Sequence, residues 1–279
     1  MLRKALLQGL LVVSGLTATL AASAANTLTD DPPMIANAPF SGVAEVQSVT
    51  TFTDGNRIVR TNSVRYFRDA QGRTRTERQG LSPQGGSATE NPSVVIGDPV
   101  SGQRLTLLPK VQAALQFKLQ GGLVSRAAAV SAYNDGNPPF ALLGIGMALG
   151  ASQSTEVSTS ITSLGQKEIN GLSATGSRIV RTIPVGVLGN EKPITNTVEQ
   201  WVSADLGMVV QFTETSSVGG SVTVTLNQVV RAEPDPALFT VPSNYKVQNV
   251  PGPDPLASGR VSTATATFSN AASATPASH

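Results

Sequence analysis

The sequence of 279 residues contains no cysteine, and its only histidine is the last residue, His279. Without cysteine there are no disulfides, no thiol nucleophile and no cysteine for lipid attachment. A histidine at the end of an Ala-, Ser- and Thr-rich tail cannot be held against a nucleophile, which excludes Ser-His-Asp and Cys-His mechanisms. The common zinc sites draw on the same two residue types. We therefore expect no metal site and no cofactor.

Phosphate-binding and dinucleotide-binding motifs are also missing from the sequence. No Gly-rich loop ends in Lys-Ser or Lys-Thr, and no Rossmann fingerprint follows a strand. A pair of carboxylates could still act as acid and base. The candidate acids fall in turns or on polar strand faces, where such residues usually form turns or face solvent; they are Asp54, Asp69, Glu77, Asp98, Glu191, Glu199, Asp205 and Glu214. We expect no catalytic residue and no enzyme, and a carboxylate-based hydrolase is the weakest of three functional hypotheses.

Charge and aromatic side chains are scarce, at 14% and 4% of the residues. The first 24 residues carry two of the 20 basic residues and none of the 18 acidic ones, so the rest of the chain is formally neutral. A neutral chain has no general attraction to nucleic acid or to anionic membranes. Ser, Thr, Gly, Ala and Val dominate instead, a balance typical of β-strands joined by tight turns.

The N-terminal residues 1–24 have the pattern of a signal peptide. Arg3 and Lys4 precede an apolar run from Ala5 to Leu20, and Ala22-Ser23-Ala24 supplies the small residues of a cleavage site. The apolar run is too short for a comfortable membrane span. We expect cleavage and export to the periplasm or beyond, with no transmembrane segment left in the mature chain.

The remaining residues divide into three parts. Residues 25–40 form a flexible, exposed leader, residues 41–250 a single antiparallel β domain, and residues 251–279 a disordered tail of Ala, Ser, Thr and Pro. Within the domain, residues 121–154 lose the strand pattern and become rich in Ala and Gly. The insertion includes an Ala-rich piece from Arg126 to Ala132. We expect the insertion as a whole to be mobile and to contain one or two short helices.

Alternating apolar residues and turn signals predict a mainly β fold. Asn170-Gly171 is the strongest hairpin signal, and Leu81–Pro92 has the composition of a loop. The predicted strands are Val43–Phe52, Arg57–Arg68, a solvent-facing Arg73–Gln79, Ser93–Gly97, Gln103–Leu107, Val111–Leu119, Thr155–Leu164, Leu172–Ile183, Thr195–Ser203, Met208–Thr215 and Ser221–Arg231.

Several of these strands have one apolar face. In Val111–Leu119 the apolar residues alternate with polar ones, so period two fits better than the period of a helix. A sheet with such a face must cover a second layer, helices or a bound apolar ligand. The candidate ligand-binding residues are Met208, Val210, Phe212, Val222, Val224, Leu226, Val111, Leu115 and Phe117.

Arginine is concentrated in one double hairpin, residues 57–78. Arg73 and Arg75 point to one side of their strand and are candidate anion-binding residues for a lipid phosphate, an acidic glycan or an acidic protein. Alternatively, this charge keeps the sheet from pairing edge to edge with another copy. Nucleic acid is not an expected partner, because few aromatic residues lie among the arginines.

Two groups of proteins resemble this sequence. A group of uncharacterised secreted bacterial proteins is similar over roughly residues 41–250, at Asp54–Arg57, Tyr66–Arg75, Ile96–Gly102, Thr182–Glu191, Trp201–Gly207 and Glu233–Tyr245. Three features are similar to the lipoprotein-carrier (LolA-like) superfamily: Pro109 between two strands, a Trp201 strand turned at Asp205-Leu206-Gly207, and a closing Leu238-Phe239. This resemblance implies a curved antiparallel sheet, an incomplete barrel with an apolar concave face capped by helices. Members carry or sense acyl chains in the periplasm.

The leading hypothesis is an exported, non-enzymatic envelope protein that binds an apolar ligand, a lipid or acyl chain, or a lipidated partner in the concave face of a half-barrel. The alternative is a structural or protein-interaction module of the envelope, with a fully packed sheet and no ligand. The sequence leaves the oligomeric state open.

Overall fold

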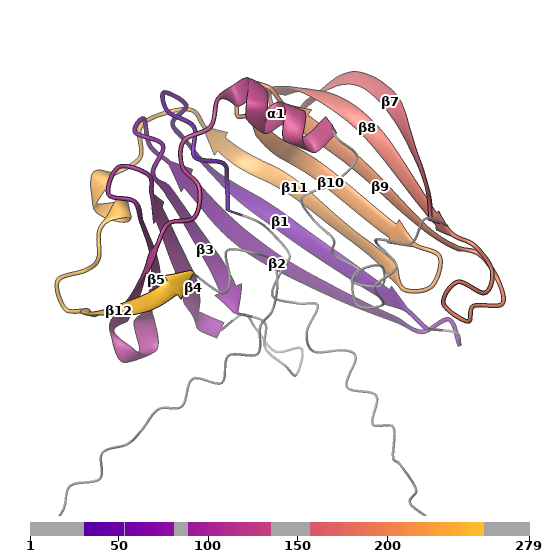
Figure 1. Cartoon of the computed structure of the whole chain (residues 1–279), viewed down its shortest axis with the longest axis horizontal. Helices are drawn as coiled ribbons and strands as arrows, with labels where there is room; N and C mark the ends of the chain where they lie inside the picture. The colour runs from indigo at the N-terminus through magenta and orange to yellow at the C-terminus, as the bar shows by residue number, and fades with distance from the viewer. Residues whose placement is uncertain (1–30, 53, 81–88, 135–156, 254–279) are drawn as a thin grey trace, which may run out of the picture.

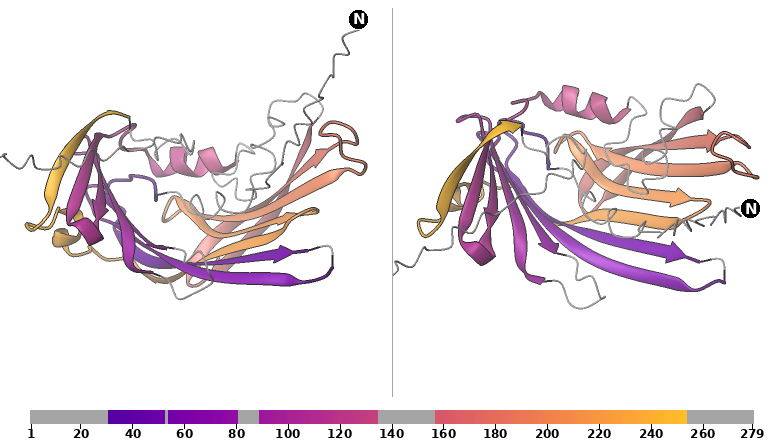
Figure 2. Two further views of the ribbon diagram at one scale, coloured as in Figure 1. Left: turned by 90° about the horizontal axis from the view of Figure 1, so that it is seen from below. Right: turned by 60° about the horizontal axis from the view of Figure 1, so that its bottom comes forward.

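Twelve strands form one strongly curved sheet in the computed structural model, which describes residues 31–52, 54–80, 89–134 and 157–253 (Figures 1 and 2). The sheet is bent into a trough whose two end strands lie far apart, so no barrel closes. The strands are β1 (Phe40–Thr51), β2 (Arg57–Arg68), β3 (Thr74–Gly80), β4 (Thr89–Asp98), β5 (Gln103–Leu108), β6 (Ala113–Lys118), β7 (Ser158–Ile169), β8 (Leu172–Ile183), β9 (Ile194–Ser203), β10 (Met208–Ser216), β11 (Gly220–Val230) and β12 (Lys246–Pro253).

The strand order is β12-β6-β5-β4-β3-β2-β1-β11-β10-β9-β8-β7. Neighbours are antiparallel throughout, except that β12 pairs in parallel with β6. Two meanders, β1 to β6 and β7 to β11, meet where β1 pairs with β11. The predicted fold class, mainly β with a curved antiparallel sheet and few short helices, is confirmed, with β12 as the one parallel addition.

Local turn chemistry defines the best-predicted strands. β2 and β8 begin and end at the predicted residues. Asn170 and Gly171, which join β7 to β8, have φ of 51° and 79°. A type I′ hairpin turn needs positive φ at both central residues, and Asn-Gly tolerates this best. The strongest hairpin prediction is therefore confirmed.

Other boundaries differ from the predicted ones. β4 begins at Thr89, inside the predicted loop, and β12 extends to Pro253, inside the predicted tail. The prediction that β3 faces solvent is wrong, because Thr74 and Thr76 are 2% and 0% exposed. The physical reason is that other segments of the chain cover β3 on both faces.

The segment predicted to begin a strand at Val111 is instead a 3-10 turn, η2 (Pro109–Val111). Proline opens the turn, since its fixed φ and missing N–H suit a first helical position. Gln112 then takes a positive φ of 48° before β6 begins. A second 3-10 turn, η4 (Pro236–Phe239), precedes β12 and begins at Asp235, whose side chain accepts a hydrogen bond from the Ala237 N–H.

One α-helix, α1 (Arg126–Asn134), lies on the concave side of the sheet (Figure 2). The helical part expected in the insertion is thus present, and it packs against β9 and β10. The Ser125 hydroxyl accepts a hydrogen bond from the Ala128 N–H and caps the first turn. The rest of the insertion, 135–154, lies outside the described residues. In the part of the chain that is described, no helix is long and apolar enough to cross a membrane.

The sheet buries apolar residues on both sides. The larger cluster lies on the concave side, comes mainly from β1, β2 and β8 to β11, and receives Val130 and Tyr133 from α1. The smaller cluster joins Ile96, Leu105 and Leu107 to Val241 and Tyr245. The strand register places the smaller cluster on the same face of the sheet as Arg75. Thr74 and Thr76 point to the other face. Strands β3 to β5 are therefore covered on both faces.

Residues 31–38, here called the strap, cross the concave side before β1 begins. Ile35 and Ala38 are only 2% and 6% exposed, and they pack on Ala129 of α1. The expectation of an exposed leader is wrong for this stretch, because its apolar side chains complete the core. The predicted signal peptide, the leader before residue 31 and the tail after residue 253 lie outside the described residues, so they stay predictions.

Candidate functional site

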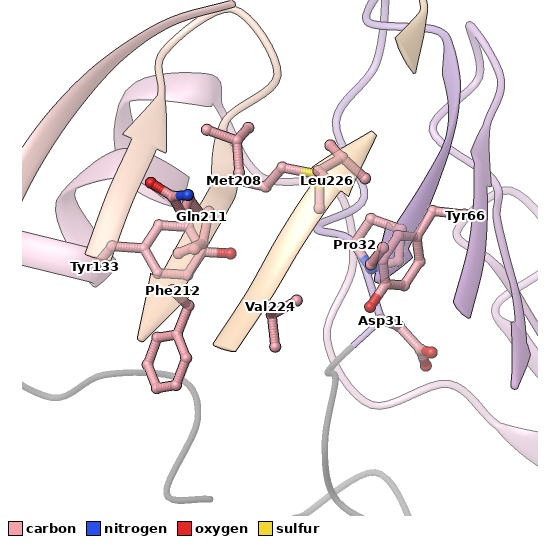
Figure 3. Close-up of a pocket in the computed structure, with 12 residues that line it drawn as sticks. Asp31, Pro32, Tyr66, Tyr133, Met208, Gln211, Phe212, Val224 and Leu226 are labelled. Carbon is pink, nitrogen blue, oxygen red and sulfur yellow. The ribbon is translucent and has the colours of Figure 1, made fainter. Parts of the chain in front are cut away.

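A cavity of about 30 Å³ lies on the concave side, between the strap, α1 and strands β1, β2, β10 and β11 (Figure 3). In Figure 3, Asp31, Pro32 and Tyr66 lie on one side of the cavity, Tyr133 and Phe212 on the other, and Met208 and Val224 between them. Its walls are formed by Asp31, Pro32, Ala44, Tyr66, Tyr133, Met208, Val209, Val210, Gln211, Phe212, Val224 and Leu226. This volume accommodates one or two water molecules.

The structure brings together most of the predicted apolar site residues. Met208, Val210 and Phe212 of β10 line the cavity with Val224 and Leu226 of β11. Phe212 pairs with Val224 across the two strands, and its side chain is fully buried. Val222 is buried on the same face, opposite Glu214, but does not line the cavity.

The three predicted residues from the segment 111–119 do not reach the cavity. Leu115 and Phe117 of β6 pair with Thr106 and Arg104 of β5 and do not line the cavity. Val111 is 68% exposed in η2, and its assignment to the apolar face is wrong. The 3-10 turn at Pro109 takes this residue out of the sheet before β6 starts.

The first polar anchor of the strap is Asp31, at one end of the cavity. Its Oδ1 accepts a hydrogen bond of 2.9 Å from Arg78 Nη2, and its Oδ2 one of 2.5 Å from Arg104 Nη1. Only 14% of the Asp31 side chain is exposed. Burial by itself would raise the pKa of this carboxyl, but the charges of Arg78 and Arg104 and hydrogen bonds outweigh burial and lower the pKa below its ordinary value.

The second anchor is Arg68 of β2, whose side chain is fully buried. Its guanidinium donates hydrogen bonds to the carbonyl oxygens of Pro33, Ala38 and Leu206, at 2.8 to 2.9 Å. It also stacks on Phe40, 4.8 Å from the ring centre. Burial, followed by the charge of Arg126, lowers the pKa of Arg68 to about 10, so the group stays charged at neutral pH. Arg68 thus fastens the strap to the turn between β9 and β10.

The strap and α1 are also fastened to each other. The Val124 N–H donates to the Met34 carbonyl at 2.9 Å, and Arg126 Nη2 donates to the Asn37 carbonyl at 2.7 Å. At the far end of the helix, Gln200 Nε2 donates to the Tyr133 carbonyl. Strap and helix therefore form one cover over the concave face, held to the sheet by these polar contacts and by the apolar packing of Val130 and Tyr133.

The predicted anion-binding arginines lie away from this cavity. Arg73 pairs with Asp69 at 2.5 Å and stacks on Phe239, 5.1 Å from the ring centre. Arg75 pairs with Glu77 at 2.7 Å and donates to the Leu238 carbonyl at 2.8 Å. Both arginines do point to one side, as predicted, but they hold η4 against the convex face and already have carboxylate partners. Anion binding by this pair stays a prediction, and the contacts give it no support.

Six of the eight candidate acids serve turns or ion pairs. Asp54 and Asp98 accept hydrogen bonds from N–H groups of their own turns. Glu199 pairs with Arg178, and Asp205 pairs with Arg231. Among the described residues, no group of three or more His, Asp or Glu side chains is placed to hold a metal ion.

The polar end of the cavity was not predicted from the sequence. Asp31 was assigned to an exposed leader, and Arg104 carried no motif. Arg78 had a usable signal, since its position in β3 has the opposite parity to Arg73 and Arg75 and so faces the other side of the sheet. Tyr133 came from the predicted insertion, for which no packing partner could be named.

Comparisons with known proteins give matches among solved structures alone. No family model and no curated protein matches the chain. The crystal structure of MucB matches at 14% identity over 77% of this chain and 61% of MucB, with a TM-score of 0.34. The lipoprotein LppX of Mycobacterium tuberculosis matches at 15% identity over 70% of this chain and 88% of LppX, with a TM-score of 0.27.

A LolA superfamily protein from Nitrosomonas europaea is also among the matches, as the sequence resemblance predicts. Its identity is 6%, over 73% of this chain and 90% of the matched chain, with a TM-score of 0.26. The chain spans about 61% of the length of MucB. All three TM-scores are below 0.5, so we take no function from these proteins.

Proposed function

We propose that this chain is an exported, non-enzymatic protein of the cell envelope that binds an apolar ligand, a lipid or acyl chain, in the concave face of its half-barrel. The observation that carries the proposal is the composition of the cavity wall. Five side chains predicted from the sequence, Met208, Val210, Phe212, Val224 and Leu226, line one cavity under a cover. Binding sites for small molecules are typically concave and apolar, with a few polar groups that set orientation.

Binding of an acyl chain requires the cover to move. The cavity measures about 30 Å³, whereas pockets for small ligands hold about 300–1,000 Å³. The cover consists of the nine-residue helix α1 and the eight-residue strap, neither of which is part of the sheet. A displaced strap and helix would leave the strands unchanged and the apolar face open to a ligand.

A second function is favoured by the burial of the concave side chains. Phe40 and Phe212 are fully buried, and Val210 is 1% exposed. Side chains packed this well are typical of a stable core. A structural or protein-interaction module with no ligand would keep the cover permanently in place.

Binding of a fluorescent fatty-acid probe, together with native mass spectrometry of the protein isolated from its host, separates the two functions. Lipid binding predicts a saturable probe signal and co-purifying lipid mass. Val224→Phe fills the cavity and should abolish probe binding, whereas Val230→Phe, at a 55% exposed position of the same strand, should not. A lipid-free mass with no probe signal would reject lipid binding and favour the packed module.

A further inference from the structure

Two arginines on the concave side converge on a single carboxylate that does not belong to the sheet. Arg78 Nη2 contacts Asp31 Oδ1 at 2.9 Å, and Arg104 Nη1 contacts Asp31 Oδ2 at 2.5 Å. Each carboxylate oxygen thus receives one charged donor. Hydrogen bonds between two charged partners are shorter and stronger than neutral ones, and guanidinium groups are well suited to carboxylates and phosphates.

Strand register, and not the strap, fixes the position of the two arginines. Thr76 of β3 pairs with Val95 of β4, which pairs with Thr106 of β5. Arg78 lies two residues after Thr76 and Arg104 two residues before Thr106, so all four side chains are on one face. The arginines would therefore remain on this face if the strap carrying Asp31 moved away.

A buried hydroxyl next to the arginines adds a second polar feature. Thr106 is 7% exposed, and its Oγ1 has no hydrogen-bond partner among the described residues. A buried polar group without a partner costs free energy. A phosphate head group has a further oxygen that could accept the hydroxyl proton, which the Asp31 carboxylate does not.

This polar cluster adjoins the apolar cavity. Asp31 and Pro32 line the cavity together with Ala44, Val224 and Leu226, and Figure 3 shows Asp31 beside Tyr66 at its edge. A cationic end followed by an apolar wall matches an anionic head group with a hydrocarbon chain. The matching occupant has a carboxylate or phosphate where the Asp31 carboxylate now lies.

We infer that Arg78 and Arg104 form the head-group site for a single-chain anionic amphiphile, and that Asp31 of the strap occupies this site in place of the ligand. The inference rests on the proposed function and names the class of ligand. Ligand binding replaces the Asp31 carboxylate with the carboxylate or phosphate of the ligand and releases the Asp31 end of the strap, while Arg68 still holds Pro33 and Ala38. Carboxylate and phosphate head groups share the required chemistry.

The test compares four ligands of equal chain length at pH 7.5, each below its aggregation concentration: oleate, oleyl phosphate, oleyl alcohol and oleylamine. We expect the wild-type protein to bind the two anions about tenfold more tightly than the alcohol and the amine, as one charged hydrogen bond of about 1.4 kcal/mol implies. Comparison of oleate with oleyl phosphate identifies the preferred head group. This arm needs no variant and so does not depend on the folding of one.

Variants then show which residues cause the preference for anionic ligands. Asp31→Ala should raise the affinity for the anions about tenfold further, and Arg104→Gln should remove the preference over the alcohol. The matched controls are Asp54→Ala, at an exposed turn, and Arg65→Gln, whose side chain is 61% exposed, and both should leave binding unchanged. Thermal melting of each variant confirms that it is folded.

The outcomes separate this inference from the proposed function. Equal binding of the alcohol and both anions, unaffected by Asp31→Ala, would overturn the head-group site while leaving apolar binding intact. Failure of all four ligands, with the wild-type protein and with Asp31→Ala, would overturn both. A preference for anions that persists in Arg104→Gln and is lost in Arg65→Gln would overturn the assignment to Arg104.

Discussion

Asp31 and Arg104 are 73 residues apart in sequence and form a 2.5 Å hydrogen-bonded ion pair on the concave side of the sheet. The pair joins the strap to β5, while Arg78 joins the same carboxylate to β3. Breaking a partly buried ion pair of this kind destabilises the fold, because removal of one partner leaves the other charges desolvated and without a counter-charge. The pair therefore links strap position to the charge of a single carboxyl group.

Acid should weaken the strap anchor. Because the folded-state pKa of Asp31 is lowered, its contribution to the free energy of unfolding is present above the ordinary pKa, about 4, and is lost as pH falls through the folded value. We expect Asp31→Asn to be about 2 kcal/mol less stable than wild type at pH 7 by urea unfolding, with a smaller difference at pH 3. A difference that is the same at both pH values would contradict this account, and Asp54→Asn serves as the exposed control.

Arg68→Lys should loosen the strap. A lysine ammonium cannot reproduce the planar guanidinium contacts to Pro33, Ala38 and Leu206. We expect a loss of about 3 kcal/mol in the free energy of unfolding and faster hydrogen exchange at the Asn37 N–H, which donates to Ala70. Arg60→Lys, at an exposed position of the same strand, should change neither. Unchanged exchange at Asn37 in Arg68→Lys would show that the strap is held by other contacts.

Gly176→Ala should displace the single tryptophan. A Cβ at Gly176 would lie 2.6 to 2.7 Å from three ring atoms of Trp201, its partner across β8 and β9. We expect a cost of about 1–3 kcal/mol from overpacking and a shift in tryptophan emission, which only Trp201 produces. Gly122→Ala is the control, since nothing lies within 4 Å of the point that a Cβ would occupy there. Wild-type emission and stability in Gly176→Ala would contradict the close packing of the ring.

Asn170→Ala should weaken the link between the β7–β8 hairpin and β11. The Asn170 side-chain amide donates to the Leu226 carbonyl and to Asn227 Oδ1, each at 2.8 Å, and the residue has a positive φ. Loss of these hydrogen bonds and strain at the turn should together cost about 2 kcal/mol in urea unfolding. Asn170→Gly, which relieves the strain but lacks the amide, should lose less. Equal stability of all three proteins would show that the turn contributes nothing.

Local signals account for what the sequence could predict. The limits of β2 and β8, the Asn170-Gly171 turn and the apolar faces of β10 and β11 all follow from period-two patterns and turn residues within a few positions. These signals are also what identified five of the cavity residues. Such signals depend only on residues that are close together in the chain, so a single sequence is enough to recognise them.

Long-range contacts account for what the sequence could not predict. Burial of the strap depends on Arg68, Arg78 and Arg104, which contact strap residues 30 to 73 positions away in the chain. Alternation correctly predicted a strand at residues 113–117, but not which of its side chains are buried: Ala114, which breaks the alternation, is fully buried in the smaller cluster, whereas Leu115 is only half-buried. Nor could alternation show that Pro109 would turn Val111 out of the sheet. The polar sequence of β3 predicts a solvent-facing strand, and the segments that cover it come from other parts of the chain.

An apolar chain is expected to bind on the concave face. Photocrosslinking tests it most directly: the protein is irradiated with a fatty acid that carries a diazirine in its chain, and the modified residues are mapped by mass spectrometry. We predict adducts on β1, β10 and β11 around Ala44, Phe212 and Val224, and their loss in excess unlabelled fatty acid. Adducts confined to the convex face, or labelling that excess ligand does not reduce, would contradict the claim.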